Sequence, residues 1–193
     1  MPRNIEIKAR VADLVKLRSK VLTLAPRSQQ RLAQRDTFFP ALEGRLKLRC
    51  FGDGSGEIIA YSRTDSAGPK ESAFQKVACA DPAAVERTLS LALGVRGVVE
   101  KRREVFLVGQ TRVHLDEVVG LGSFLELEVV LREDQTIEGG DRIARELLSR
   151  LEISSKDLIA VSYIDLLEGD ALEGGAVEDG AVEDSSESSP ENP

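Results

Sequence analysis

Tryptophan is absent from this 193-residue chain, and only 4% of its residues are aromatic. A surface that stacks nucleic-acid bases or other flat ligands therefore has few side chains to build on. Cysteine is also scarce: Cys50 and Cys79 lack CxxC spacing, which gives a disulfide or a structural zinc site little support. No segment matches the glycine-rich pattern G-x-x-x-x-G-K-[ST]. Nucleotide binding by a loop of that kind is therefore not expected.

Long apolar runs are missing as well. No stretch approaches the roughly 20 residues that a membrane-spanning helix requires, and the first residues do not resemble a secretory signal. We therefore expect a cytoplasmic protein without a membrane partner.

Positive charge is absent from the end of the chain. Residues 168–193 contain nine of the 33 acidic residues and none of the 26 Lys and Arg residues, and the sequence GAVED occurs there twice. The remaining 167 residues are thus nearly neutral, whereas a nucleic-acid-binding surface needs a clear basic excess. We expect one domain over residues 1–167, no nucleic-acid partner, and an acidic disordered tail over 168–193.

What the sequence does contain is alternation of charged and apolar residues. Residues two apart in a strand point to the same face. The alternation predicts strands near 4–11, 31–39, 45–51, 57–63 and 71–78, and three more within 98–131. Capping signals and apolar spacing predict three helices, near 14–25, 82–93 and 141–151. We expect an α+β, mainly antiparallel protein in which eight strands close into a tunnel barrel with a charged interior, covered by about three helices.

If the charged faces converge inside the barrel, cations and carboxylates line one space. The predicted cations are Lys8, Arg10, Lys47, Arg49, Arg63, Lys76, Lys101, Arg103 and Arg112. The predicted carboxylates are Glu6, Asp116, Glu126 and Glu128. Crowded cations call for an anion such as a triphosphate, and carboxylates beside it call for Mg²⁺ or Mn²⁺ to bridge them to the phosphates. The competing interpretation is an ordinary sheet whose charged face meets water.

Several motifs, in this order along residues 3–167, resemble the CYTH superfamily of triphosphate tunnel enzymes, and its class IV adenylyl cyclase branch in particular. They are Glu6-Ile7-Lys8, the pair Lys47 and Arg49, Lys101-Arg102-Arg103, the segment from Arg112 to Asp116, the GLGxFLELE run and SYIDLL. The resemblance implies an eight-stranded tunnel, dependence on a divalent metal, and synthesis of cyclic AMP or hydrolysis of thiamine triphosphate or inorganic triphosphate.

The resemblance also implies roles for individual residues. Glu6 and Glu126 correspond to metal ligands, with Glu128 and Asp116 as further candidates, and Lys8, Glu6 and Asp116 fall at the reacting centre. The cations listed above correspond to phosphate binders. One position departs from the family: its amino-terminal signature is E-x-E-x-K, and here Asn4 stands in place of the first glutamate. An asparagine offers a metal one neutral oxygen and no charge.

Three functions are therefore compatible with the sequence. The first is a metal-dependent triphosphatase acting on inorganic triphosphate or a small organic triphosphate, which the scarcity of aromatic residues favours. The second is an adenylyl cyclase, and the third, motivated by Asn4, is a module that binds triphosphate without turnover. His114, the single histidine, is interpreted as a lining residue that bonds Asp116 or phosphate rather than as a catalytic base. A monomer or a homodimer fits each case.

Overall fold

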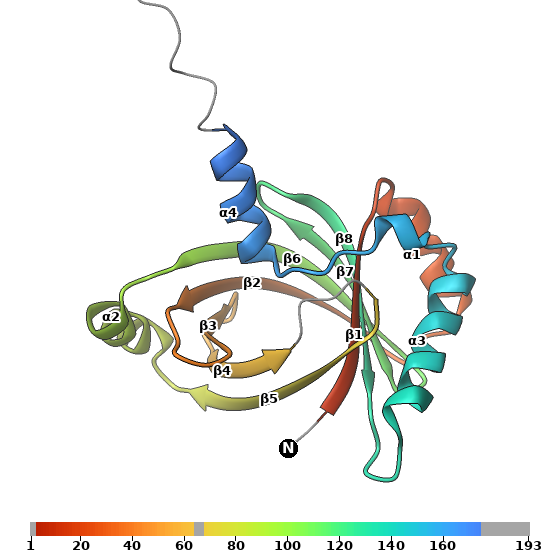
Figure 1. The fold of residues 1–193 in the computed structure, drawn as a ribbon, viewed down its shortest axis with the longest axis horizontal. Helices are drawn as coiled ribbons and strands as arrows, with labels where there is room; N and C mark the ends of the chain where they lie inside the picture. The colour runs from red at the N-terminus through yellow and green to blue at the C-terminus, as the bar shows by residue number, and fades with distance from the viewer. Residues whose placement is uncertain (1–2, 64–67, 175–193) are drawn as a thin grey trace, which may run out of the picture.

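Eight antiparallel strands close into a barrel in the computed structural model, which describes residues 3–63 and 68–174 (Figure 1). The strands are β1 (Arg3–Arg10), β2 (Gln29–Phe39), β3 (Arg45–Phe51), β4 (Gly56–Arg63), β5 (Lys70–Cys79), β6 (Gly97–Val108), β7 (Thr111–Val118) and β8 (Gly122–Val130). Around the barrel they follow the order β1-β5-β4-β3-β2-β6-β7-β8, and β8 pairs with β1 to close it. The predicted fold class is confirmed.

The helices lie outside the barrel or at its end. They are α1 (Leu14–Thr23), α2 (Pro82–Leu93), α3 (Ile137–Arg150) and α4 (Tyr163–Gly174), with a short 3₁₀ turn at Ser155–Asp157. Side chains of Asp13, Asp81 and Thr136 accept a backbone N–H at the start of α1, α2 and α3, respectively. The predicted boundary at residue 167 lies inside α4, and residues 175–193 lie outside the described part. None of the helices in that part combines the length and apolar character needed to cross a membrane.

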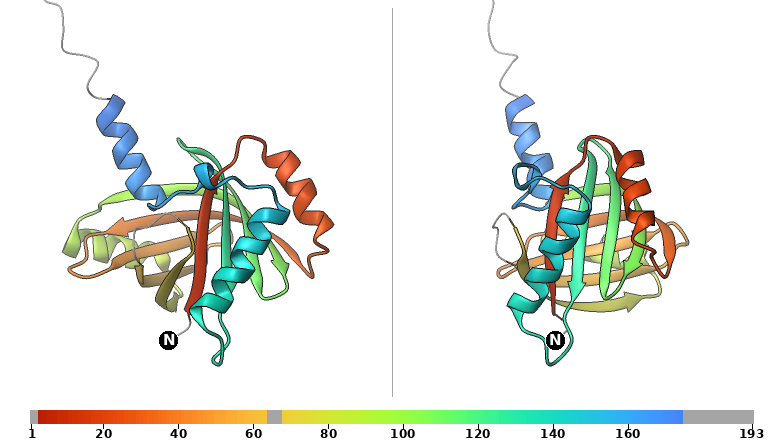
Figure 2. Two further views of the ribbon diagram at one scale, coloured as in Figure 1. Left: turned by 45° about the vertical axis from the view of Figure 1, so that its right-hand side comes forward. Right: turned by 90° about the vertical axis from the view of Figure 1, so that its right-hand side faces the viewer.

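The main hydrophobic core lies between the outer face of the barrel and the helices α1 and α3, which flank β1, β7 and β8 (Figure 2). Alternate residues of the strands, such as Ile5, Ile7 and Leu127, are fully buried there. Gly140 lets α3 approach closely, because a Cβ at this position would lie 2.5 Å from Leu131 Cδ2 and 2.7 Å from Ile5 Cγ1. Apolar burial is therefore outside the barrel wall, which leaves the interior to polar side chains.

A second apolar cluster lies at one end of the barrel, where β2 and β7 end and β6 and β8 begin. The first turn of α4 contributes Tyr163 and Ile164 to it, beside Phe124 and Val99. The segment before α4 is tied to the barrel by backbone hydrogen bonds, including one from Ile159 to the carbonyl of Lys8. The carboxyl-terminal segment is thus part of the barrel's interior wall at this end.

Candidate functional site

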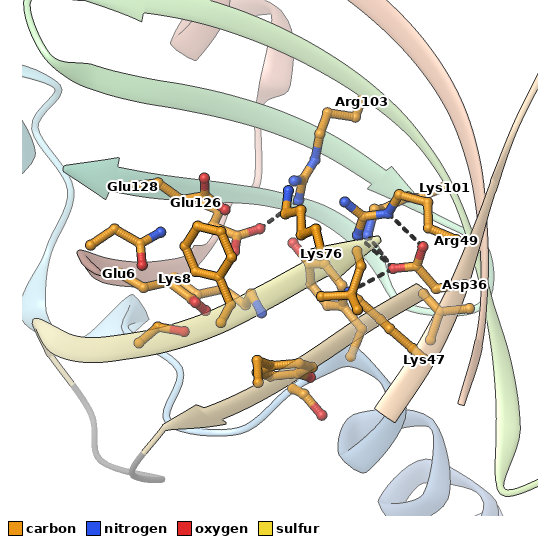
Figure 3. A pocket seen from close by; sticks show the side chains of 18 of the residues that line it. Glu6, Lys8, Asp36, Lys47, Arg49, Lys76, Lys101, Arg103, Glu126 and Glu128 are labelled. Carbon is orange, nitrogen blue, oxygen red and sulfur yellow. Dashed lines mark hydrogen bonds and ion pairs between the residues drawn. The ribbon is translucent and has the colours of Figure 1, made fainter. Parts of the chain in front are cut away.

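The interior of the barrel contains a cavity lined mainly by polar and charged side chains (Figure 3). Its described charged lining residues are Glu6, Lys8, Asp36, Lys47, Arg49, Lys76, Lys101, Arg103, Arg112, Glu126 and Glu128. In Figure 3 the glutamates gather on one side, Asp36 with its cations gathers on the other, and Arg103 lies between. We call these the carboxylate side and the Asp36 side. The cavity is therefore divided by charge.

Strand register builds the carboxylate side. Glu128 on β8 lies opposite Glu6 on β1 and opposite Arg112 on β7. Two residues earlier on the same face of β8, Glu126 lies opposite Lys8 on β1 and His114 on β7. His114 Nδ1 lies 3.8 Å from Glu126 Oε2 and 4.0 Å from Glu128 Oε1. Ligand atoms from these three residues lie within 4.8 Å of one another, which suits a shared metal ion.

Two buried polar atoms on this side have no hydrogen-bond partner among the described residues, Asn4 Oδ1 and His114 Nδ1. Buried polar atoms are rarely left unsatisfied unless a ligand, ion or water completes them. Asn4 lines the same cavity as Glu6, Glu126 and Glu128. An oxygen-rich set with one nitrogen fits a divalent cation such as Mg²⁺ or Mn²⁺. The residues present therefore fit the metal that the sequence predicted.

The Asp36 side is organised by one buried carboxylate. Arg49 donates to both Asp36 oxygens through Nε and Nη2, at 2.7 Å each, and Lys47 and Lys101 donate at 2.9 Å and 3.2 Å. Burial alone would raise the pKa of Asp36, but the charges of Lys101, Lys47 and Arg49 together lower it well below its usual range. The carboxylate is therefore ionised at neutral pH. Burial also lowers the pKa of Lys47 to about 7 and that of Lys101 to about 8.

Arg103 connects the two sides. Its Nε donates to Asp116 Oδ1 at 2.7 Å, and its Nη2 donates to Asp116 and to Glu126. Asp116 also accepts a hydrogen bond from the hydroxyl of Tyr163. Burial raises the pKa of Tyr163 well above its usual value, and the charge of Asp116 adds to this, so the phenol stays protonated and remains a donor. Asp116, which does not line the cavity, thus fixes the orientation of the Arg103 guanidinium, which does.

The structure brings most of the predicted site residues into one cavity. Three of them, Asp116, Arg10 and Arg63, are not among its described lining residues. Asp116 is not among the described lining residues, since both its oxygens are engaged by Arg103 and Tyr163, so a metal-ligand role is not favoured for it. Arg10 is exposed and donates to the carbonyl of Leu121, outside the described lining. The side chain of Arg63 lies outside the described residues.

Sequence reasoning missed two residues of the site, Asp36 and Tyr163. Asp36 lies in the predicted strand near 31–39, and its two-residue spacing from Gln34 and Phe38 places it on the inward face with them. That phase was a usable signal. Tyr163 belongs to the SYIDLL motif, so the resemblance marked its position. Its contact with Asp116 joins positions 47 residues apart and could not be derived from local spacing.

A closed antiparallel barrel with carboxylates and cations inside it defines a class of protein whose interior is suited to binding a metal ion with a polyanion. The sequence pattern of the CYTH domain matches residues 2–163, and the chain belongs to that family.

The chain is similar in sequence to a known protein and in fold to solved structures. The adenylate cyclase CyaB of Aeromonas hydrophila is 25% identical over 174 residues, which is 86% of this chain and 88% of that protein. The PH1012 protein of Pyrococcus horikoshii has a solved structure with a TM-score of 0.75 and 26% identity, covering 84% of this chain and 98% of that one. HpAC1 of Hippeastrum, described as having a dominant triphosphatase activity, has a TM-score of 0.58 and 16% identity, covering 88% and 96% of the two chains.

Proposed function

We propose that this protein is a divalent-metal-dependent triphosphatase that hydrolyses inorganic triphosphate or a small organic triphosphate, such as thiamine triphosphate, inside the barrel. The observation that carries the proposal is the division of the cavity by charge. Glutamates that can hold a metal occupy one side, and cations that can hold phosphate oxygens continue from it to the other. A linear polyanion bridging the two sides satisfies both.

The residues of the chain hold the metal and stabilise the charge of the leaving group. Glu6, Glu126 and Glu128 hold the metal, with the oxygen of Asn4 and the nitrogen of His114 as additional donors. When bound, such an ion polarises a phosphoryl oxygen and lowers the pKa of a coordinated water. Hydrolysis breaks the bond between the terminal phosphorus and its bridging oxygen, which leaves with the diphosphate. The oxygen of water bonds to the terminal phosphorus, one hydrogen stays on the new phosphate, and the other proton goes to the diphosphate.

Lys8 lines the carboxylate side and Arg103 lies between the two sides, so both can stabilise the charge that develops on the leaving diphosphate. Glu126 accepts a hydrogen bond from Arg103. Burial would raise the pKa of Glu126, but the positive charges of Arg103 and Lys8 lower it well below its usual value, so it is ionised and available to a metal. Arg103 thus serves both sides.

The second candidate is an adenylyl cyclase, favoured by the similarity to CyaB of Aeromonas hydrophila. A cyclase must fix adenine at the mouth of the cavity. The lining rings of Phe38 and Tyr61 already contact a cation, because Lys47 Nζ lies 5.3 Å and 5.5 Å from their centroids. This arrangement favours phosphate binding over base stacking, and therefore hydrolysis.

A substrate panel tests the proposal. Inorganic triphosphate, thiamine triphosphate and ATP are each incubated with the protein and Mg²⁺ or Mn²⁺, and phosphate and cyclic AMP are measured in the same samples. We expect phosphate release and little cyclic AMP. Cyclic AMP formation at a rate rivalling phosphate release would establish the cyclase instead, and binding of triphosphate without any release would establish a binding module.

A further inference from the structure

Asp36 is a carboxylate on the phosphate-binding side of the cavity, where a site for anions would be expected to present only cations. It is 1% exposed, it lines the cavity, and it accepts hydrogen bonds from Lys47, Arg49 and Lys101. These three cations are themselves at most 13% exposed at their side chains. The cluster is therefore an enclosed group of three basic side chains around one carboxylate.

Strand register explains why the cations meet at this point. Asp36 lies at the inner face of β2, between β3 on one side and β6 on the other. Arg49 on β3 is its direct cross-strand partner, Lys47 is two residues from Arg49, and Lys101 on β6 lies opposite Gln34, two residues from Asp36. All three cations therefore surround one carboxylate because of the fold. Without that carboxylate they would face one another with no counter-charge, which is costly in a buried setting.

We propose that Asp36 is an internal counter-anion that takes the electrical place of a phosphate while the cavity is empty, and that it thereby limits how tightly this side of the cavity holds a triphosphate or its diphosphate product. The inference rests on the proposed triphosphate site. Asp36 keeps the three cations assembled before the ligand arrives, and it leaves a smaller charge excess for the ligand to neutralise. The residue sets affinity and release without touching the reacting phosphorus.

A purely structural ion pair would not require this placement. Arg35 and Glu86 form such a pair on the opposite face of β2, with Thr37 as a further donor to Glu86. Asp36 instead faces the cavity together with its three partners. Burial and the charge of Arg49 lower the pKa of Lys47 to about 7 and that of Lys101 to about 8, although the charge of Asp36 acts to raise both. A further anion beside these lysines would favour their charged forms. A second anion is therefore still attracted to this side of the cavity.

The test compares Asp36→Asn with the wild type by calorimetric titration of inorganic triphosphate and of diphosphate in the presence of EDTA, and by thermal unfolding with and without each anion. We expect Asp36→Asn to be less stable alone, to bind triphosphate at least about tenfold more tightly, and to gain more thermal stability from the anion than the wild type gains. Turnover should then be slower, with a lower KM and a lower kcat, because product leaves more slowly.

Two matched variants separate charge from architecture. Asp36→Asn/Lys101→Met restores the wild-type charge excess of the cluster and should return triphosphate affinity to near the wild-type value. Glu86→Gln removes an acid of α2 that pairs with Arg35 on the outer face of β2, and it should leave the affinity unchanged. Equal or weaker anion binding by a folded Asp36→Asn variant overturns the inference.

The outcome is decisive even where Asp36→Asn is poorly folded. The inference predicts that adding inorganic triphosphate restores its folding, and failure to fold with the anion present contradicts the counter-anion role. Binding without hydrolysis by the wild type removes the proposed triphosphatase and leaves the role of Asp36 intact. A wild type that binds no triphosphate overturns both.

Discussion

The hydroxyl of Tyr163 donates a 2.8 Å hydrogen bond to Oδ2 of Asp116, and this contact joins the start of α4 to the interior of the barrel. Asp116 in turn orients Arg103. Lys8 Nζ lies over the ring of Tyr163, 4.0 Å from its centroid. One side chain of the carboxyl-terminal helix thus supports a cation of the site through a carboxylate and contacts another directly.

Replacing Tyr163 separates these two contributions. Tyr163→Phe removes the hydroxyl and keeps the ring, so we expect a loss of about 1.5–3 kcal/mol in the free energy of unfolding, typical of a hydrogen bond to a charged group. Tyr163→Leu also removes the ring and should reduce both stability and triphosphate affinity further. Urea unfolding and calorimetry measure the two effects. Equal stability and affinity in the wild type and both variants would show that α4 does not support the site.

The fold was predictable because it depends on local alternation. Residues two apart, such as Lys101 and Arg103, carry their orientation in the sequence itself, and the order of the family motifs added the topology. Which charged residues bind each other depends instead on register across strands far apart in sequence. The hydrogen bond between Lys101 and Asp36 follows from that register, and so does the pairing of Asp116 with Arg103 outside the cavity lining. Neither could be derived from spacing alone.

Asn4 gives a prediction about metal affinity. Its buried Oδ1 has no partner among the described residues, and it lines the cavity beside the glutamates. Asn4→Glu adds a charged ligand, so we expect tighter Mn²⁺ binding by at least about tenfold and greater activity at low metal concentration. Asn4→Gln, which keeps the neutral amide, is the control and should show no such gain. A metal affinity that Asn4→Glu leaves unchanged would place the ion away from this residue.

His114 gives a spectroscopic prediction. If its Nδ1 coordinates the metal together with Glu126 and Glu128, Mn²⁺ bound to the protein should show magnetic coupling to a ¹⁴N nucleus in pulsed electron paramagnetic resonance. His114→Gln should abolish the coupling while Mn²⁺ still binds through the glutamates. Coupling that persists in the variant, or is absent from the wild type, would exclude the imidazole from the metal site.

Triphosphate binding should depend on pH, because the pKa of Lys47 is lowered to about 7 and that of Lys101 to about 8. A bound triphosphate favours the protonated lysines and raises both pKa values, so binding takes up protons. As the pH rises from 7 through 8, the free lysines lose their charge and this contribution to affinity declines.

Lys47→Met provides the reference for that measurement, because the titration of the ligand itself is common to both proteins. Calorimetry in buffers of different ionisation enthalpy should find greater proton uptake by the wild type, and the ratio of wild-type to variant affinity should fall with rising pH. A ratio independent of pH would show that Lys47 is fully charged in the empty cavity.

The central claim is that glutamates inside the barrel make triphosphate hydrolysis dependent on a metal. The most direct measurement is phosphate release from inorganic triphosphate, with and without Mn²⁺, by the wild type, by Glu126→Gln and by Glu117→Gln, whose glutamate is exposed on the outer face of β7. We predict metal-dependent release by the wild type and Glu117→Gln, and a loss of at least about 100-fold in a folded Glu126→Gln protein. Release without metal, or undiminished release by Glu126→Gln, would contradict the account.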